Sequence, residues 1–188
     1  MKLSVILLAA GLSARMGEDK LLMEMGKKTL LQIAVDILDE IKAFEKIIVT
    51  SKQRLNKITL PNEIKAIINT DPGRGQSSSI KLGLSNTSGT HYLFMAADQP
   101  LLGLSDVEQI TDAARLNPDK IIYPQIDSKP GMPAIFPGAF RDELLALTGD
   151  TGGRVLRDKY PEKCLIIKPK HPGNFKDIDT IGEYHAFS

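Results

Sequence analysis

The chain has 188 residues, of which 42% are hydrophobic and 25% charged, and this composition suits one domain with a buried core. Its 24 basic and 23 acidic side chains give a formal net charge of +1, so charge offers no reason to expect nucleic acid or an anionic membrane as a partner. The single cysteine excludes an internal disulfide and a metal cluster built on cysteines alone.

An apolar run from Leu3 to Ala9 predicts a first strand, which ends just before Gly11. The start superficially resembles a signal peptide, but its apolar core is too short and a glycine-bearing loop follows at once. No run in the chain approaches the ~20 apolar residues that span a bilayer. We therefore expect a soluble, cytoplasmic protein.

The loop after this strand combines glycine, a hydroxyl and two cations. Gly11 lets main-chain N–H groups approach phosphate oxygens, Ser13 adds a hydroxyl, and Arg15 and Lys20 can neutralise negative charge. The loop therefore predicts an anion site, the alternative being a solvated loop without a role. Its spacing of glycines and lysine fits neither a Walker A loop nor the dinucleotide fingerprint.

Strands and helices alternate along much of the chain. Expected strands span residues 3–9, 46–50, 64–69, 91–96 and 164–168, with another beginning at residue 121. Expected helices span residues 30–41, 53–58, the region of 80–84, 105–117, 138–147 and 150–159. Capping boxes, Thr29 with Gln32 and Ser105 with Glu108, mark two of the helix starts. This alternation predicts a three-layer, Rossmann-like α/β/α architecture with a mostly parallel sheet, in a single domain spanning residues 1–188.

Two segments depart from this alternation. Residues 125–136 carry Pro, Gly and isolated apolar residues, which predicts a hairpin or an excursion over the edge of the sheet. Residues 176–180 predict a last short strand before a terminal helix.

Ligands of open α/β sheets bind outside the carboxyl ends of the strands, and a polar loop precedes the helix near residue 80. Gly75, Gln76, Ser77 and Ser78 there offer main-chain donors, an amide and hydroxyls that can bind a nucleotide base. The alternative is a cluster of residues that only caps the helix.

Carboxylates follow two of the expected strands. Asp98 comes directly after the strand of residues 91–96, where it can bind Mg²⁺ on a triphosphate or cap the next turn. Asp177 and Asp179 alternate, so a strand would place both carboxylates on one side. One of them can be a second metal ligand and the other a helix cap, and the sequence does not say which.

Two later clusters suggest an acceptor pocket. Gly131 and Pro133 belong to a stiff turn that can form one wall, although a simple hairpin turn is an equal alternative. Asp150, Gly152 and Arg154 lie at an expected helix start that can bind an anion. The alternative there is a capped helix with a solvated arginine.

Several of these segments resemble one known family. The segments are Leu8–Lys20, Gln76–Ser79, Ala97–Leu102, Pro130–Pro133, Gly149–Arg154 and Asp177–Thr180. They resemble, in order and over nearly the whole chain, the nucleotidyltransferase superfamily that contains the molybdenum-cofactor guanylyl- and cytidylyltransferases. The resemblance implies a glycosyltransferase-A-like fold.

The branch of the family is suggested by Ala10, because guanylyltransferases tend to have two glycines where this chain has Ala10 and Gly11. The resemblance thus favours the cytidylyltransferases, and implies transfer of CMP from CTP to the terminal phosphate of a molybdopterin-type cofactor with Mg²⁺ as the metal. A molybdoenzyme would receive the product. Gly153 departs from the family pattern, which has alanine there, and the usual proline is missing after Thr180.

The resemblance also implies roles for the residues. Arg15 and Lys20 would hold the triphosphate, and Asp98 with Asp177 or Asp179 would hold the metal. The nucleotide would contact Ala9, Ala10, Gly11, Ser13, Gly75, Gln76, Ser77 and Ser78, and the acceptor would contact Gly131, Pro133, Asp150, Gly152 and Arg154. Alternatives are transfer from GTP, transfer to a sugar phosphate, and a non-catalytic accessory protein that binds nucleotide or molybdenum cofactor.

Overall fold

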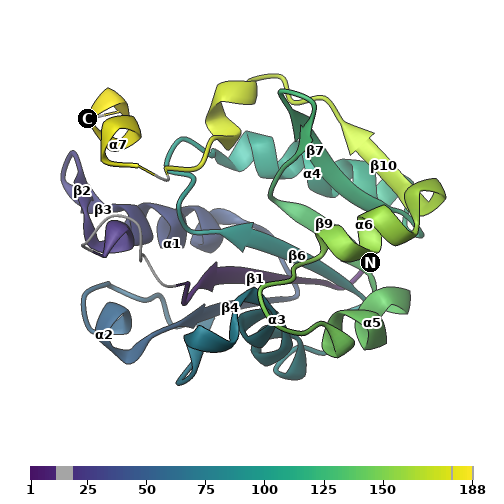
Figure 1. The fold of residues 1–188 in the computed structure, drawn as a ribbon, viewed down its shortest axis with the longest axis horizontal. Coiled ribbons are helices and arrows are strands. Elements are labelled where there is room, and N and C mark those ends of the chain that lie inside the picture. Colours follow the sequence, from purple (N-terminus) through teal and green to yellow (C-terminus); the bar gives the residue numbers. More distant parts are fainter. Residues whose placement is uncertain (12–18, 179, 188) are drawn as a thin grey trace.

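The computed structural model describes residues 1–11, 19–178 and 180–187. The central sheet contains β1 (Leu3–Ala9), β4 (Glu45–Thr50), β5 (Ile64–Ile68), β6 (His91–Ala96), β7 (Ile121–Ile126), β9 (Ala134–Pro137) and β10 (Cys164–Ile167). Their order is β10-β7-β9-β6-β1-β4-β5. Figure 1 labels all of these strands except β5. The short β8 (Lys129–Pro130) pairs with β7, and β2 (Glu24–Met25) with β3 (Lys28–Thr29) forms a separate hairpin. β1 pairs in parallel with β4 and β6, which confirms the predicted α/β class with a mostly parallel sheet.

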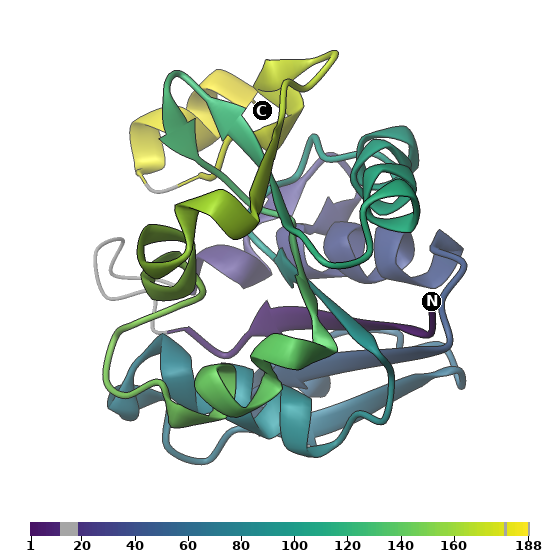
Figure 2. The same cartoon turned by 90° about the vertical axis from the view of Figure 1, so that its right-hand side faces the viewer.

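Helices cover both faces of the sheet (Figure 2). They are α1 (Leu30–Glu40), α2 (Lys52–Leu55), α3 (Gln76–Ser85), α4 (Leu104–Leu116), α5 (Arg141–Ala146), α6 (Arg154–Lys159) and α7 (Ile181–Phe187). Alternate residues of β1 enter different apolar clusters: Leu7 packs with α1 and α4, and Ile6 packs with α3 and α5. A strand that is buried on both faces of a sheet has a nearly continuous apolar sequence, which is why the strand of residues 3–9 could be predicted. Among the described residues, no helix is long and apolar enough to cross a bilayer.

One predicted helix cap is correct and the other is wrong. Thr29 Oγ1 accepts a hydrogen bond from Gln32 N at 3.1 Å, although the Gln32 side chain bonds to the backbone of Thr59 and not to the cap. Helix α4 begins earlier than the box of Ser105 and Glu108 predicts. Gly103 is its cap, and the buried Asp106 carboxylate accepts from Gly103 N at 3.0 Å.

Residues 125–130 confirm the predicted hairpin, because β8 pairs antiparallel with the end of β7. Strand β9 contradicts the alternative, an excursion over the sheet edge, because it lies inside the sheet. It is antiparallel to β6 and β7, and Ile135 is in register with Leu93 on one side and Ile122 on the other. All four residues of β9 are buried. A short apolar run that follows a turn can insert between two parallel strands when its side chains are buried on both faces of the sheet. Here the burial of β9 favours this position over one at the sheet edge.

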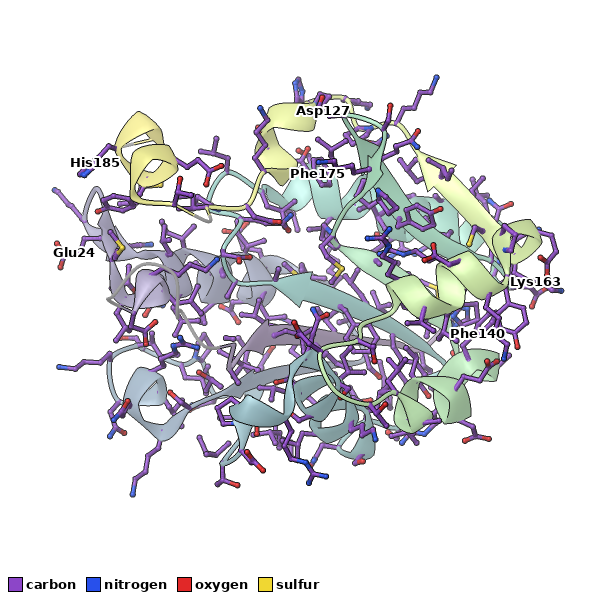
Figure 3. The ribbon with its side chains drawn as sticks, viewed as in Figure 1. Glu24, Asp127, Phe140, Lys163, Phe175 and His185 are labelled. Atoms are coloured by element: carbon purple, nitrogen blue, oxygen red, sulfur yellow. The ribbon has the colours of Figure 1, made fainter. Side chains whose placement is uncertain are left out.

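The end of the described chain crosses the carboxyl ends of the strands. Residues 176–178 form no strand, contrary to the prediction, and Ile178 N instead donates to Asp98 O at 2.9 Å. The following α7 reaches the β2–β3 hairpin, where the Tyr184 hydroxyl donates to Glu24 O. Figure 3 labels Glu24 and His185 at this end of the molecule.

Candidate functional site

A cavity of about 600 Å³ lies at the carboxyl ends of β1 and β6. These strands are neighbours in register, with Leu8 beside Ala96, so the loops that follow them open at the same edge of the sheet. Seven of the predicted site residues line this cavity: Ala10, Gly11, Lys20, Gly75, Gln76, Asp98 and Asp150. The topology thus brings together groups that lie up to 140 positions apart in the sequence.

Lys20 and Asp98 form an ion pair in the wall of the cavity. The Lys20 Nζ lies 2.7 Å from Asp98 Oδ2 and 2.9 Å from the main-chain oxygen of Ile178. The two side chains are 15% and 23% exposed, so the pair is partly shielded from solvent and yet accessible from the cavity. Such a pair presents a cation for an anionic ligand next to a hard oxygen ligand for a metal.

The residues that can hold a metal suit a site where the ion is shared between the protein and a bound phosphate. They do not suit a site in which protein side chains supply all the ligands. Within the described ranges, no group of three or more His, Cys, Asp or Glu side chains can surround an ion. Asp98 faces the cavity, and the exposed Asp177 immediately precedes Ile178. Mg²⁺ commonly takes only one or two protein carboxylates and completes its shell with water and phosphate oxygens, so this sparse set suits it. Ser13, Arg15 and Asp179 lie outside the described residues.

The serines at the start of α3 are engaged in holding the loop. The Ser77 hydroxyl donates to Gly149 O at 2.7 Å, and the Ser78 hydroxyl donates to Gly75 O at 2.8 Å. Asn69 Nδ2 in turn donates to Ser78 Oγ at 2.9 Å. These two predicted nucleotide contacts are not in the described lining of the cavity, and their hydroxyl protons are directed to the main chain.

The carboxylate of Asp150 caps α3 from a different loop. Its Oδ1 accepts from Gln76 N at 3.3 Å. The Gln76 side chain packs on Gly152, where an added Cβ would lie 2.3 Å from Gln76 Oε1. The first N–H group of the helix is therefore satisfied by a protein carboxylate, and negative charge already occupies this side of the cavity.

Ser79 also lines the cavity; it belongs to the family-like segment Gln76–Ser79, but it was not among the residues expected to contact the nucleotide. It lies three residues after Gln76 on α3, and residues with that spacing share one face of a helix. Its Oγ accepts from Asn69 Nδ2 at 3.0 Å, which leaves its own proton for another acceptor. The helical spacing from Gln76 was the available signal.

The predicted acceptor wall at Gly131 and Pro133 lies beyond the described lining of this cavity. Gln99, which follows β6, connects this turn to the end of that strand. Its Nε2 donates to Met132 O at 3.2 Å and to Phe175 O at 2.7 Å. A Cβ on Gly131 would lie 2.3 Å from Ile126 Cδ1, so this turn packs closely on β7.

A partly buried arginine also supports this turn. Arg157 donates from Nη1 to Gly131 O at 3.2 Å, and its guanidinium lies 4.7 Å from the centre of the Tyr123 ring. Burial lowers the pKa of the Arg157 guanidinium, and burial raises the pKa of the Tyr123 hydroxyl. The Arg154 side chain, by contrast, is 74% exposed, its Nε lies 3.5 Å from Asp158 Oδ2, and it is not in the described lining of the cavity.

Known proteins with similar structures share this fold. Rv0371c from Mycobacterium tuberculosis H37Rv, in a complex with manganese, superposes with a TM-score of 0.78 at 19% identity over 100% of this chain and 98% of that chain. The 4-diphosphocytidyl-2C-methyl-D-erythritol synthase from Anaerococcus prevotii DSM 20548 gives a TM-score of 0.76 at 18% identity over 98% and 93%. At these identities the likeness shows the fold.

Sequence comparison adds a curated relative and a family. A probable molybdenum cofactor guanylyltransferase from Natranaerobius thermophilus is 25% identical over 125 residues, a match spanning 65% of this chain and 60% of that relative. The model of the MobA-like NTP transferase domain matches residues 5–164. The expected resemblance is confirmed: this chain belongs to the MobA-like NTP transferase domain family.

Proposed function

We propose that this protein is a nucleotidyltransferase that moves CMP from CTP onto the terminal phosphate of a molybdopterin-type cofactor and releases pyrophosphate. The observation that carries the proposal is the Lys20–Asp98 pair, 2.7 Å apart in the wall of a cavity of about 600 Å³. Lys20 supplies a cation for the triphosphate, and Asp98 supplies a carboxylate for its metal. The family assignment supports this interpretation.

In the proposed reaction, an acceptor phosphate oxygen attacks the α-phosphorus in line. The bond from the α-phosphorus to the oxygen that bridges to the β-phosphorus breaks, and pyrophosphate leaves with that oxygen. Positioning and charge neutralisation supply most of the catalysis in such a transfer. Lys20 and Arg15 would stabilise the charge that develops on the leaving group, and the N–H groups beside Gly11 would orient the phosphates.

Asp98, with Asp177 or Asp179, would hold the metal. Mg²⁺, when bound, neutralises phosphate charge and favours pyrophosphate as a leaving group. The sparse carboxylate set described above supports Mg²⁺ shared between protein and substrate.

The charge distribution orients the nucleotide in the proposal. The Asp150 carboxylate at the start of α3 disfavours a phosphate group there, whereas the Lys20 ammonium, which also lines the cavity, attracts one. We therefore assign the triphosphate to the Lys20 side, and the base or sugar to the side of Gln76 and Ser79. The acceptor would approach past Gly131, Pro133, Gly152 and Arg154, whose exposed guanidinium suits a phosphorylated molecule.

A guanylyltransferase is the second candidate, because the curated relative is named as one. Cytosine and guanine both carry an exocyclic amino group, so acceptor oxygens on the α3 side suit either base. Ala10 supports CTP through the family pattern. We further propose that the chain acts as a single cytoplasmic domain and passes its product to a molybdoenzyme.

One experiment separates these possibilities. The protein is incubated with each labelled NTP, Mg²⁺ and a molybdopterin-type cofactor, and pyrophosphate release is measured. Release with CTP alone supports the proposal, and a preference for GTP moves the protein to the second candidate. Nucleotide binding without release with this cofactor or with any sugar phosphate supports an accessory binding protein, and release only with a sugar phosphate changes the acceptor.

A further inference from the structure

Arg54 is a buried cation that the proposed reaction does not use. It lies on α2, and its side chain is only 6% exposed. An arginine is rarely buried unless its charge is paired and its donors are bonded. Its presence here calls for a structural or functional explanation.

The guanidinium of Arg54 binds two points of the chain at once. Nε lies 2.7 Å from Asp19 Oδ2, and Nη2 lies 2.8 Å from Asp19 Oδ1, which makes a bidentate pair. Nη1 donates to Ala9 O at 2.7 Å. Only a planar guanidinium offers donors in this fork, so a lysine cannot replace all three bonds.

These two points are the two ends of the predicted anion loop. Ala9 is the last residue of β1, and Asp19 directly precedes Lys20. Asp19 Oδ1 also accepts from Leu21 N at 3.3 Å, so the same carboxylate caps the 3₁₀ turn that carries Lys20. Arg54 therefore fixes both the entry of the loop and the orientation of the turn at its exit.

The contacts continue from this turn to the ion pair. Lys20 is the first residue of the capped turn, and its Nζ reaches Asp98 at 2.7 Å. Arg54 is absent from the described lining of the cavity, so it acts through Asp19. Arg54 fixes the Asp19 carboxylate with two hydrogen bonds. Because Lys20 is the next residue, this also restricts where the Lys20 backbone lies.

We propose that Arg54 is a positioning residue of the nucleotide site: it clamps the two ends of the loop between Ala9 and Asp19 and so holds Lys20 where it can meet a triphosphate. This inference rests on the proposed function. It adds to the proposed site a residue that lies outside the segments resembling the family. It also explains why the charged Arg54 side chain is buried. It also assigns Asp19 a role as the link between Arg54 and the lysine.

The test uses inorganic triphosphate and CTP or GTP as probes, with the dissociation constant measured by calorimetry. Arg54→Lys, Arg54→Met and Asp19→Asn are each expected to weaken triphosphate binding by about tenfold or more, since each removes a charge-assisted bond from the clamp. The matched control is Arg115→Met, because Arg115 forms an exposed pair with Asp112 on α4. Its binding and turnover should equal those of the wild type.

A double-mutant cycle distinguishes positioning from general stability. If Arg54 acts through Lys20, then Arg54→Lys adds little further loss in a Lys20→Met background. In turnover assays, KM for the nucleotide should rise while KM for the acceptor stays the same. Circular dichroism and thermal melting identify any variant that fails to fold, and Asp19→Asn then tests the clamp from its other side.

Each outcome has one meaning. If the wild type binds nucleotide and the Arg54→Lys and Asp19→Asn proteins bind it equally well, the inference is wrong and the proposed function stands. Losses that multiply in the cycle also overturn it, because Arg54 would then act independently of Lys20. If the wild type binds neither nucleotide nor inorganic triphosphate, the proposed function fails and this inference fails with it.

Discussion

Gly75 packs against the backbone of Gly149 so closely that a Cβ on Gly75 would lie 2.4 Å from the Gly149 carbonyl carbon. Gly75 also has a φ of +86°, a conformation that L side chains rarely adopt. We therefore expect Gly75→Ala to separate the two loops, weaken nucleotide binding and destabilise the fold by about 1–3 kcal/mol. Calorimetric binding and urea denaturation check both effects. Gly173→Ala, at a position with open space, is the control and should change neither.

Gly153 replaces the alanine of the family pattern, and its environment explains why. A Cβ there would lie 2.3 Å from Phe136 Cζ on β9. We expect Gly153→Ala to destabilise the protein by about 1–3 kcal/mol through overpacking. Combining it with Phe136→Leu should recover part of that loss, as urea denaturation of the two single variants and the double variant will show. Strictly additive losses would refute the steric explanation.

The Lys20–Asp98 pair makes a prediction about catalysis. Lys20→Met and Asp98→Asn should each lower kcat for pyrophosphate release by about a hundredfold, because each removes a charge from the proposed triphosphate site. The control is Lys28→Met, which breaks an ion pair between β3 and Asp36 on α1, both outside the described lining of the cavity. Near-normal turnover in both site variants would contradict the proposed chemistry.

Metal binding can be measured without turnover. Mn²⁺ titrated into protein and a non-hydrolysable nucleotide, followed by electron paramagnetic resonance, should bind about tenfold or more weakly to Asp98→Asn than to the wild type. Asp177→Asn and Asp179→Asn, tested separately, show which second carboxylate takes part. Equal Mn²⁺ affinity in all four proteins would remove Asp98 from the metal site.

Cys164 gives a prediction about pH. Burial raises the pKa of the Cys164 thiol, and its sulfur lies 3.4 Å from Tyr160 O as a donor. A raised thiol pKa means that the unreactive protonated form persists to higher pH. Alkylation by iodoacetamide at pH 8, followed by mass spectrometry, should be slower than for a small-molecule thiol and should accelerate as the pH rises. Labelling as fast as that of glutathione would contradict the burial.

The parts of the fold that the sequence predicted are those set by local pattern. β1 and β6 match their predicted bounds because both are mostly apolar runs, and each is followed two residues later by Gly11 or Asp98. Lys20 and Asp98 could be predicted to meet, since each follows a strand whose carboxyl end opens at the same edge.

What the sequence could not predict depends on contacts between distant segments. The insertion of β9 between β6 and β7 requires complementary side chains from three strands, which no local pattern records. Arg54 lies in a short polar stretch, and only the folded chain shows its side chain between Ala9 and Asp19. Asp150 was predicted to contact the acceptor, and the structure shows that it caps α3.

The contact of Ile178 with both members of the ion pair has a consequence for biosynthesis. Ile178 N donates to Asp98 O and Ile178 O accepts from Lys20, so the last of three separate chain segments completes the arrangement. A nascent chain that has left the ribosome only as far as β10 already has every strand of the central sheet, but Lys20 lacks this main-chain acceptor. During translation, the proposed nucleotide site is therefore finished after the sheet that carries it.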